Sequence, residues 1–77
     1  MATSNLIEEI VVDSSFVTWA RYYNYSKKLK IEYRNGSKYE YIDIPDWKWR
    51  DFYNAESKGK FINRKVKPYY EFKKATY

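Results

Sequence analysis

The sequence contains no cysteine and no histidine, and only two glycines, two prolines and one methionine among its 77 residues. Disulfide bonds are therefore excluded, and so are the thiolate and imidazole ligands of ordinary zinc sites. A site built of carboxylates is the only metal option left, and we expect no metal and no other cofactor. A chain of this length forms one small domain, whose stability must come from the packing of its core.

Long apolar runs are also missing. No stretch is long enough to span a membrane, and the N-terminal segment MATSNLIEEIVV lacks the basic start of a signal peptide. The absence of cysteine is compatible with a reducing compartment. We therefore expect a soluble, cytoplasmic protein that does not bind membranes.

The same absences argue against catalysis. Without histidine and cysteine the chain has neither a Ser-His-Asp triad nor a cysteine nucleophile. The remaining candidates have structural explanations, because Asp43 and Asp46 flank Pro45 at a turn, and Ser14 and Ser15 favour hydrogen bonds to nearby backbone. We expect that the protein is not an enzyme.

Charge is distributed unevenly along the chain, whose net charge is +5. Residues 1–20 contain three carboxylates and no lysine or arginine, whereas residues 57–77 contain seven lysines and arginines and one carboxylate, Glu71. A surface of this kind attracts polyanions such as nucleic acid. Surface lysine and arginine also keep small proteins soluble, so the composition leaves both explanations open.

Residues 28–45 predict a β-hairpin. Its first strand alternates apolar and charged side chains, and a three-residue loop that ends with Gly36 in a left-handed conformation gathers the apolar ones on one face. That register pairs Leu29 with Tyr41, Ile31 with Tyr39, Lys30 with Glu40 and Glu32 with Lys38. Opposite charges then meet on the other face. We therefore predict that Tyr39 and Tyr41 face the core.

The rest of the chain predicts one more strand and two helices. Aromatic and β-branched residues favour a strand over 15–23. Pro45 suits the first position of a helix over 45–55, and Ser57 can cap a second helix, whose apolar stripe is expected to include Tyr69. This order predicts an α+β fold, a three-stranded antiparallel β-meander with two short C-terminal helices packed on one face.

No internal repeat or flexible linker divides the chain. We expect an N-terminal arm at residues 1–12, in which residues 5–12 favour an extended conformation by a small margin. A folded domain follows at residues 13–70, and a C-terminal tail at residues 71–77.

Several short motifs follow one another along this expected domain. They are DSS at 13–15, Tyr22, Leu29, NGS at 35–37, Tyr39-Glu40-Tyr41, Ile44-Pro45, Ala55, SKG at 57–59, Phe61, Asn63 and residues 66–69. Together they resemble the KTSC domain, and the central Tyr-x-Tyr combined with the later Pro and Ser-x-Gly is fairly specific. The chain departs from that pattern at Tyr23, where an acidic residue is usual.

The resemblance implies a compact domain of about this size. KTSC domains are known from the C-terminus of some lysyl-tRNA synthetases and as free-standing bacterial and phage proteins. RNA binding is the common suggestion for the family.

If RNA binds, the basic second helix is the expected site. Ser57 and Gly59 would leave backbone N–H groups at the start of that helix, where a phosphate is favoured. The candidate nucleic-acid-binding residues are Lys58, Lys60, Arg64, Lys65 and Lys67. A solvated helix face with a serine cap would show the same pattern, so this alternative stays open.

Aromatic residues left over from the expected core form a second candidate set, which comprises Trp47, Tyr23, Tyr25 and Tyr70. Exposed rings beside lysine and arginine have three alternative roles: to stack on unpaired bases, to anchor a protein interface, or to pack against the N-terminal arm. We therefore hypothesise a small binding module for RNA or a ribonucleoprotein. The alternative is a phage or bacterial factor that docks on a host protein through these aromatics.

Overall fold

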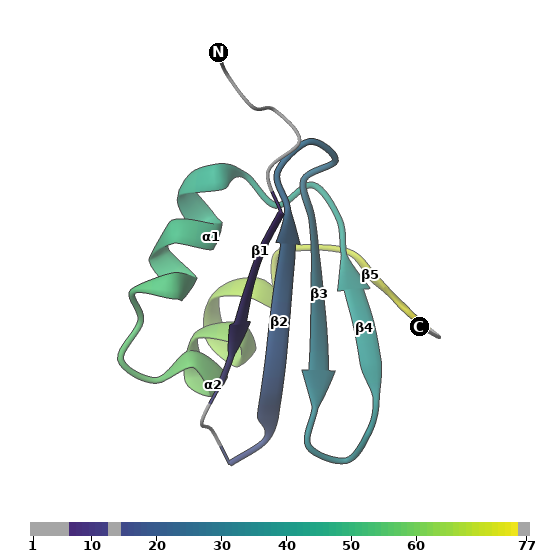
Figure 1. The fold of residues 1–77 in the computed structure, drawn as a ribbon, viewed down its shortest axis with the longest axis vertical. Coiled ribbons are helices and arrows are strands. Elements are labelled where there is room, and N and C mark those ends of the chain that lie inside the picture. Colours follow the sequence, from purple (N-terminus) through teal and green to yellow (C-terminus); the bar gives the residue numbers. More distant parts are fainter. Residues whose placement is uncertain (1–6, 13–14, 76–77) are drawn as a thin grey trace.

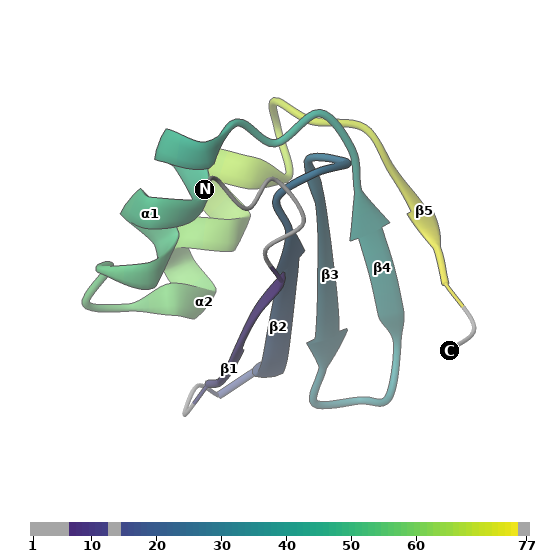
Figure 2. The same cartoon turned by 45° about the horizontal axis from the view of Figure 1, so that its top comes forward.

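The computed structural model describes residues 7–12 and 15–75, within which five strands form one antiparallel sheet (Figure 1). The strands lie side by side in chain order, from β1 to β5. The elements are β1 (Ile7–Val11), β2 (Val17–Tyr23), β3 (Lys28–Tyr33), β4 (Lys38–Tyr41), α1 (Asp46–Tyr53), α2 (Lys58–Phe61), the π-helical turn η1 (Ile62–Val66) and β5 (Phe72–Lys74). The helices cover one face of this sheet and leave the other without a covering helix (Figure 2).

The α+β class with two short helices is confirmed, but the prediction of three strands is wrong, because the described residues form five. The additional strands are β1, within the expected N-terminal arm, and β5, within the expected tail. β5 is three residues long and two of them are lysine, so its own sequence carries almost no strand signal. It forms by pairing with β4, where Phe72 lies opposite Tyr41.

The register of the β3–β4 hairpin is confirmed. The structure pairs Leu29 with Tyr41, Ile31 with Tyr39, Lys30 with Glu40 and Glu32 with Lys38. Gly36 adopts φ = 92°, the left-handed region that the three-residue loop requires. Tyr41 is fully buried, and Tyr39 is partly buried against the core. Both tyrosines therefore face the helices, as predicted.

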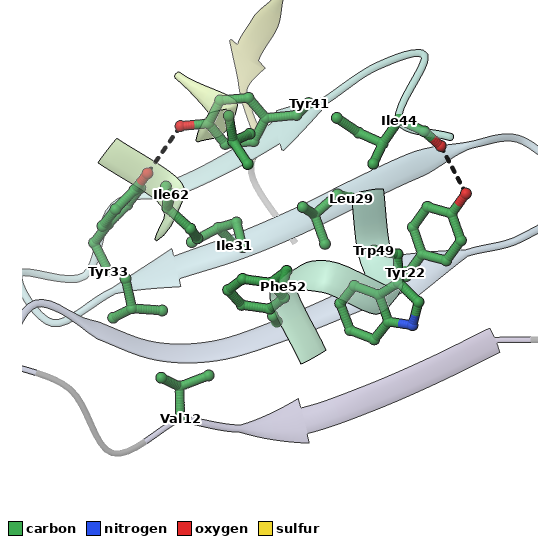
Figure 3. Close-up of a cluster of buried hydrophobic side chains, with 13 residues drawn as sticks. Val12, Tyr22, Leu29, Ile31, Tyr33, Tyr41, Ile44, Trp49, Phe52 and Ile62 are labelled. Atoms are coloured by element: carbon green, nitrogen blue, oxygen red, sulfur yellow. Dashed lines mark hydrogen bonds between the residues drawn. The ribbon is translucent and has the colours of Figure 1, made fainter. Parts of the chain in front are cut away.

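The core lies between the sheet and the helices (Figure 3). Its buried residues are Val12, Val17, Ala20, Tyr22, Leu29, Ile31, Tyr33, Tyr41, Ile44, Trp49, Phe52, Ile62 and Val66. The ring of Tyr22 stacks on Trp49 with 5.2 Å between centroids, and the hydroxyls of Tyr33 and Tyr41 lie 2.8 Å apart. Aromatic rings thus supply much of the contact area in this small core.

The helix boundaries differ slightly from the prediction. Pro45 precedes α1 in an extended conformation (ψ = 158°), so it caps the helix instead of being its first residue. Ser57 caps α2 as predicted, since its Oγ accepts from the Lys60 N–H at 3.4 Å. The expectation that Tyr69 joins the apolar stripe is wrong. The helical turns end at Val66, and the side chain of Tyr69 is 71% exposed in the turn that follows.

Candidate nucleic-acid interface

The five candidate basic residues do not form one patch. Lys58 and Lys60 line a hollow of about 440 Å³ beside the start of α2. Lys67 lines a hollow of about 330 Å³ at the turn of the β3–β4 hairpin. Lys65 lines a hollow of about 420 Å³ beside the start of α1, while Arg64 is exposed on η1.

The first two hollows adjoin each other, because Ser15 and Phe16, just before β2, line both of them. We call the two together the basic groove. It lies at the end of the molecule where the hairpin turns and α2 begins, which is the lower end in Figure 1. Its cationic lining residues are Lys58, Lys60, Arg34 and Lys67, and Glu56 is the one carboxylate among the described lining residues.

Local hydrogen bonds hold the walls of the groove in place. The Arg34 N–H donates to the Phe16 carbonyl at 2.8 Å, which ties the hairpin turn to the segment that enters β2. The ammonium of Lys58 donates to a carbonyl of the α1–α2 loop at 3.0 Å. The ammonium of Lys67 lies 5.6 Å from the ring centroid of Tyr33, within the range of a cation–π contact. The groove therefore combines a partly aromatic floor with cations at both ends.

Arg34 was not among the candidate basic residues. The sequence places it in the hairpin loop, remote from the basic helix, and only the fold brings it to the same groove as Lys67. Its position in the loop that closes the hairpin is the one sequence signal that could have singled it out.

The third hollow, which we call the Trp47 hollow, combines the two candidate sets. It is lined by Trp47, Lys48, Lys65, Tyr69 and Tyr70. Trp47 and Tyr69 are 60% and 71% exposed. The ammonium of Lys48 lies 4.9 Å from the ring of Trp47 and 5.7 Å from that of Tyr70. Lys48 could have been proposed from its place beside Trp47, whereas the expectation that Tyr69 belongs to the apolar stripe concealed its exposure.

The other two candidate aromatics lie apart from both sites. Tyr23 is at the end of β2 on the uncovered face of the sheet, and its ring contacts Tyr25 edge-on at 6.2 Å. On the same face, Glu9 accepts hydrogen bonds from Trp19 Nε1 and from the Arg21 guanidinium, each at 2.7 Å. Arg21 also donates to the Tyr23 hydroxyl at 3.0 Å. Tyr23 is therefore engaged in contacts within the sheet, whereas Tyr25 contacts it from the turn after β2.

The charges on this face shift two pKa values. Hydrogen bonds from Trp19 and then from Arg21 lower the pKa of the Glu9 carboxyl. Partial burial opposes ionisation of Tyr23, but hydrogen bonds from Arg21 and Lys30 outweigh it and lower the pKa of that phenol. The shift of Glu9 favours the charged form that pairs with Arg21 and links β1 to β2.

The residues considered for catalysis have other surroundings. The Asp46 carboxylate accepts from the Lys27 ammonium at 2.8 Å and lies 2.9 Å from the Tyr22 hydroxyl, and these contacts lower its pKa. Asp43 is exposed in a turn with φ = 58°, and Ser15 lines the basic groove. Ser14 lies outside the described residues. Within the described part of the chain, no three acidic side chains come close enough to hold a metal ion.

With this geometry in place, comparison with known proteins identifies the family. The family model of the KTSC domain matches residues 13–70. The chain belongs to the KTSC domain family. The crystal structure of a KTSC domain protein from Yersinia pestis is similar to this chain, with 25% identity, a TM-score of 0.85, and coverage of 92% of this chain and 100% of that one. No curated protein matches.

The Tyr-x-Tyr motif of the family, Tyr39-Glu40-Tyr41 in this chain, lies in β4. Both of its tyrosines face the core, where Tyr41 is buried and Tyr39 packs at the edge.

Within residues 7–12 and 15–75, no helix is long and apolar enough to cross a membrane.

Proposed function

We propose that this KTSC domain is a non-catalytic module that binds RNA, or an RNA-containing complex, by holding phosphates in the basic groove. The observation that carries the proposal is the lining of that groove. Four cationic residues from three separate parts of the fold line these two adjoining hollows, against one carboxylate among the described lining residues.

The shape of the site favours a chain of anions over a single one. The groove extends from the start of α2 to the hairpin turn, with Lys58 and Lys60 at one end and Arg34 and Lys67 at the other. A polynucleotide presents evenly repeated phosphates to such a row of cations, and this contact carries no sequence information. We therefore expect weak sequence preference.

Salt dependence tests the proposal. Four phosphate contacts on a single strand should give a slope of about −3 in a plot of log affinity against log salt. The measurement is fluorescence anisotropy of a labelled RNA at several salt concentrations. The Lys60→Ala/Lys67→Ala variant should bind more weakly, with a slope shallower by about 1.5. Lys58 is left unchanged because its ammonium also bonds to the α1–α2 loop.

A matched control removes the same charge elsewhere. The Lys28→Ala/Lys38→Ala variant loses two lysines from the uncovered side of the sheet, so it should retain both the affinity and the slope. Equal losses in the two variants would mean that affinity follows net charge, and the groove would not be the site.

The alternative function is docking on a host protein, and the exposure of Trp47 and Tyr69 in one hollow is the observation that favours it. An interface centred on aromatic anchors depends little on salt. A protein partner whose affinity is unchanged by salt, nuclease and the Lys60→Ala/Lys67→Ala substitutions would replace the RNA proposal.

A further inference from the structure

We infer that the Trp47 hollow binds an unpaired nucleotide of the RNA, with its base stacked on Trp47 and its phosphate beside Lys48 and Lys65. The inference rests on the proposed function and makes it more specific. The basic groove alone would accept phosphates from paired or unpaired RNA, whereas this hollow requires a base that is free to leave its stack.

The exposure of the rings is the first argument. The buried face of α1 carries Trp49 and Phe52, which are 3% and 0% exposed and explain the packing of that helix. Trp47 is 60% exposed and Tyr69 is 71% exposed, so the core does not account for them. Large flat rings presented to solvent beside cations are the platform on which unpaired bases stack.

The charges around the rings are the second argument. Lys48 and Lys65 line the hollow, and none of its described lining residues is acidic. Two carboxylates adjoin the lining residues in sequence. Asp46 is engaged by the Lys27 ammonium at 2.8 Å, and Glu71 is exposed and does not line the hollow. An aromatic ligand with a negative charge therefore suits the hollow better than a neutral or basic side chain. A nucleotide has that combination, because its base is aromatic and its phosphate is negatively charged.

The position of the hollow is the third argument. The α1–α2 loop is short, and the two helices run antiparallel to each other along the sheet (Figure 2). The basic groove lies where α2 begins, and the Trp47 hollow lies where α1 begins and η1 has ended. Lys65 and Lys67 are two residues apart, yet they line the different sites. A flexible single strand that follows η1 can therefore reach both, whereas a stiff duplex keeps its bases stacked inside.

The test compares a single-stranded oligoadenylate with an RNA duplex of matched length, by fluorescence anisotropy on the full chain. Trp47→Ala should weaken binding of the single strand roughly 5- to 150-fold, the range expected for one lost stacking contact. Trp47→Phe retains a ring and should stay near the wild-type affinity. Tyr25→Ala removes a ring that is 55% exposed in the turn after β2, and should have no effect.

Duplex binding separates this inference from the proposed function. We expect Trp47→Ala to leave duplex affinity unchanged while Lys60→Ala/Lys67→Ala lowers it. If Trp47→Ala and Tyr25→Ala both bind the single strand like the wild type, the stacking site is wrong and the groove remains. If the wild type binds neither RNA, the proposed function fails and this inference fails with it. A protein partner that needs Trp47, found together with RNA binding that does not, would assign the hollow to protein docking.

Discussion

The hydrogen bond between Tyr33 and Tyr41 allows a sharp test of how the core is built. The two hydroxyls lie 2.8 Å apart, and burial raises the pKa of both phenols, so each is a neutral hydroxyl at pH 7. Tyr41 is fully buried and Tyr33 is 9% exposed, and the hydrogen bond between their hydroxyls is itself buried.

This burial predicts similar costs for the two single substitutions. Tyr41→Phe and Tyr33→Phe each leave one buried hydroxyl without this partner, so each should lower the free energy of unfolding by about 2 kcal/mol. The double variant removes both hydroxyls and keeps both rings, so it should cost only about 1 kcal/mol, which implies a coupling of about 3 kcal/mol.

Urea denaturation of the four proteins, with the free energy of unfolding extrapolated to water at a common m-value, measures this cycle. If the cost of the double variant equals the sum of the two single costs within about 0.5 kcal/mol, the two hydroxyls do not stabilise each other. A cost close to zero for either single variant would show that the hydroxyl it leaves behind finds another partner.

Three further predictions concern the hairpin loop and two titrations. Gly36→Ala should lower the free energy of unfolding by about 1 kcal/mol and Tm by roughly 4 to 8 °C. The cost comes from the backbone, whose φ is +92°, and not from a clash, since no atom lies within 4 Å of the added Cβ. An unchanged Tm in a thermal melt would show that the backbone is not strained by alanine. Hydrogen bonds from Trp19 and Arg21 lower the pKa of Glu9 below 4.5, so its hydrogen bond from the Trp19 indole should persist at pH 4.5 and above and be lost as the pH falls through the pKa of the folded state. The NMR signal of the Trp19 indole N–H should shift over that pH range in the wild type and stay constant in Glu9→Gln. Burial raises the pKa of Tyr22 and Tyr41 above 10, so above pH 10 the folded state keeps protons that the unfolded state loses. The free energy of unfolding should therefore fall as the pH rises beyond 10, and it should fall less steeply in Tyr22→Phe.

The hairpin was predictable because two independent patterns select the same register. Alternation places Leu29 and Ile31 on one face, and the charge pairs on the other face agree with it. β5 was not predictable from its own residues. Its ring at Phe72 packs on Tyr39 at 5.0 Å and on Tyr41 at 5.4 Å, and such contacts between distant segments leave no trace in a local pattern.

The candidate site was predictable in composition but not in arrangement. Charge counting found the lysines of α2, of η1 and just after it, yet the chain is no longer α-helical after Phe61. The Lys67 N–H donates to the Ile62 carbonyl, five residues back, so η1 is wider than an α-helix and turns successive side chains differently. The fold then distributes Lys60, Lys65 and Lys67 among three hollows, and adds Arg34 and Lys48 from other elements.

Tyr33 connects the core with the groove, and this makes it useful for separating stability from binding. Its hydroxyl bonds to Tyr41, one of the pair in the Tyr-x-Tyr segment, while its ring lies beneath the ammonium of Lys67. Tyr33→Phe removes the first contact and keeps the second, since a cation–π contact needs the ring alone. Folded Tyr33→Phe protein should therefore be less stable but bind RNA with wild-type affinity and salt slope, as anisotropy in native buffer would show. A loss of affinity as large as that of Lys67→Ala would place the hydroxyl in contact with the ligand, and the Tyr33–Tyr41 pair would then belong to the binding surface as well as to the core.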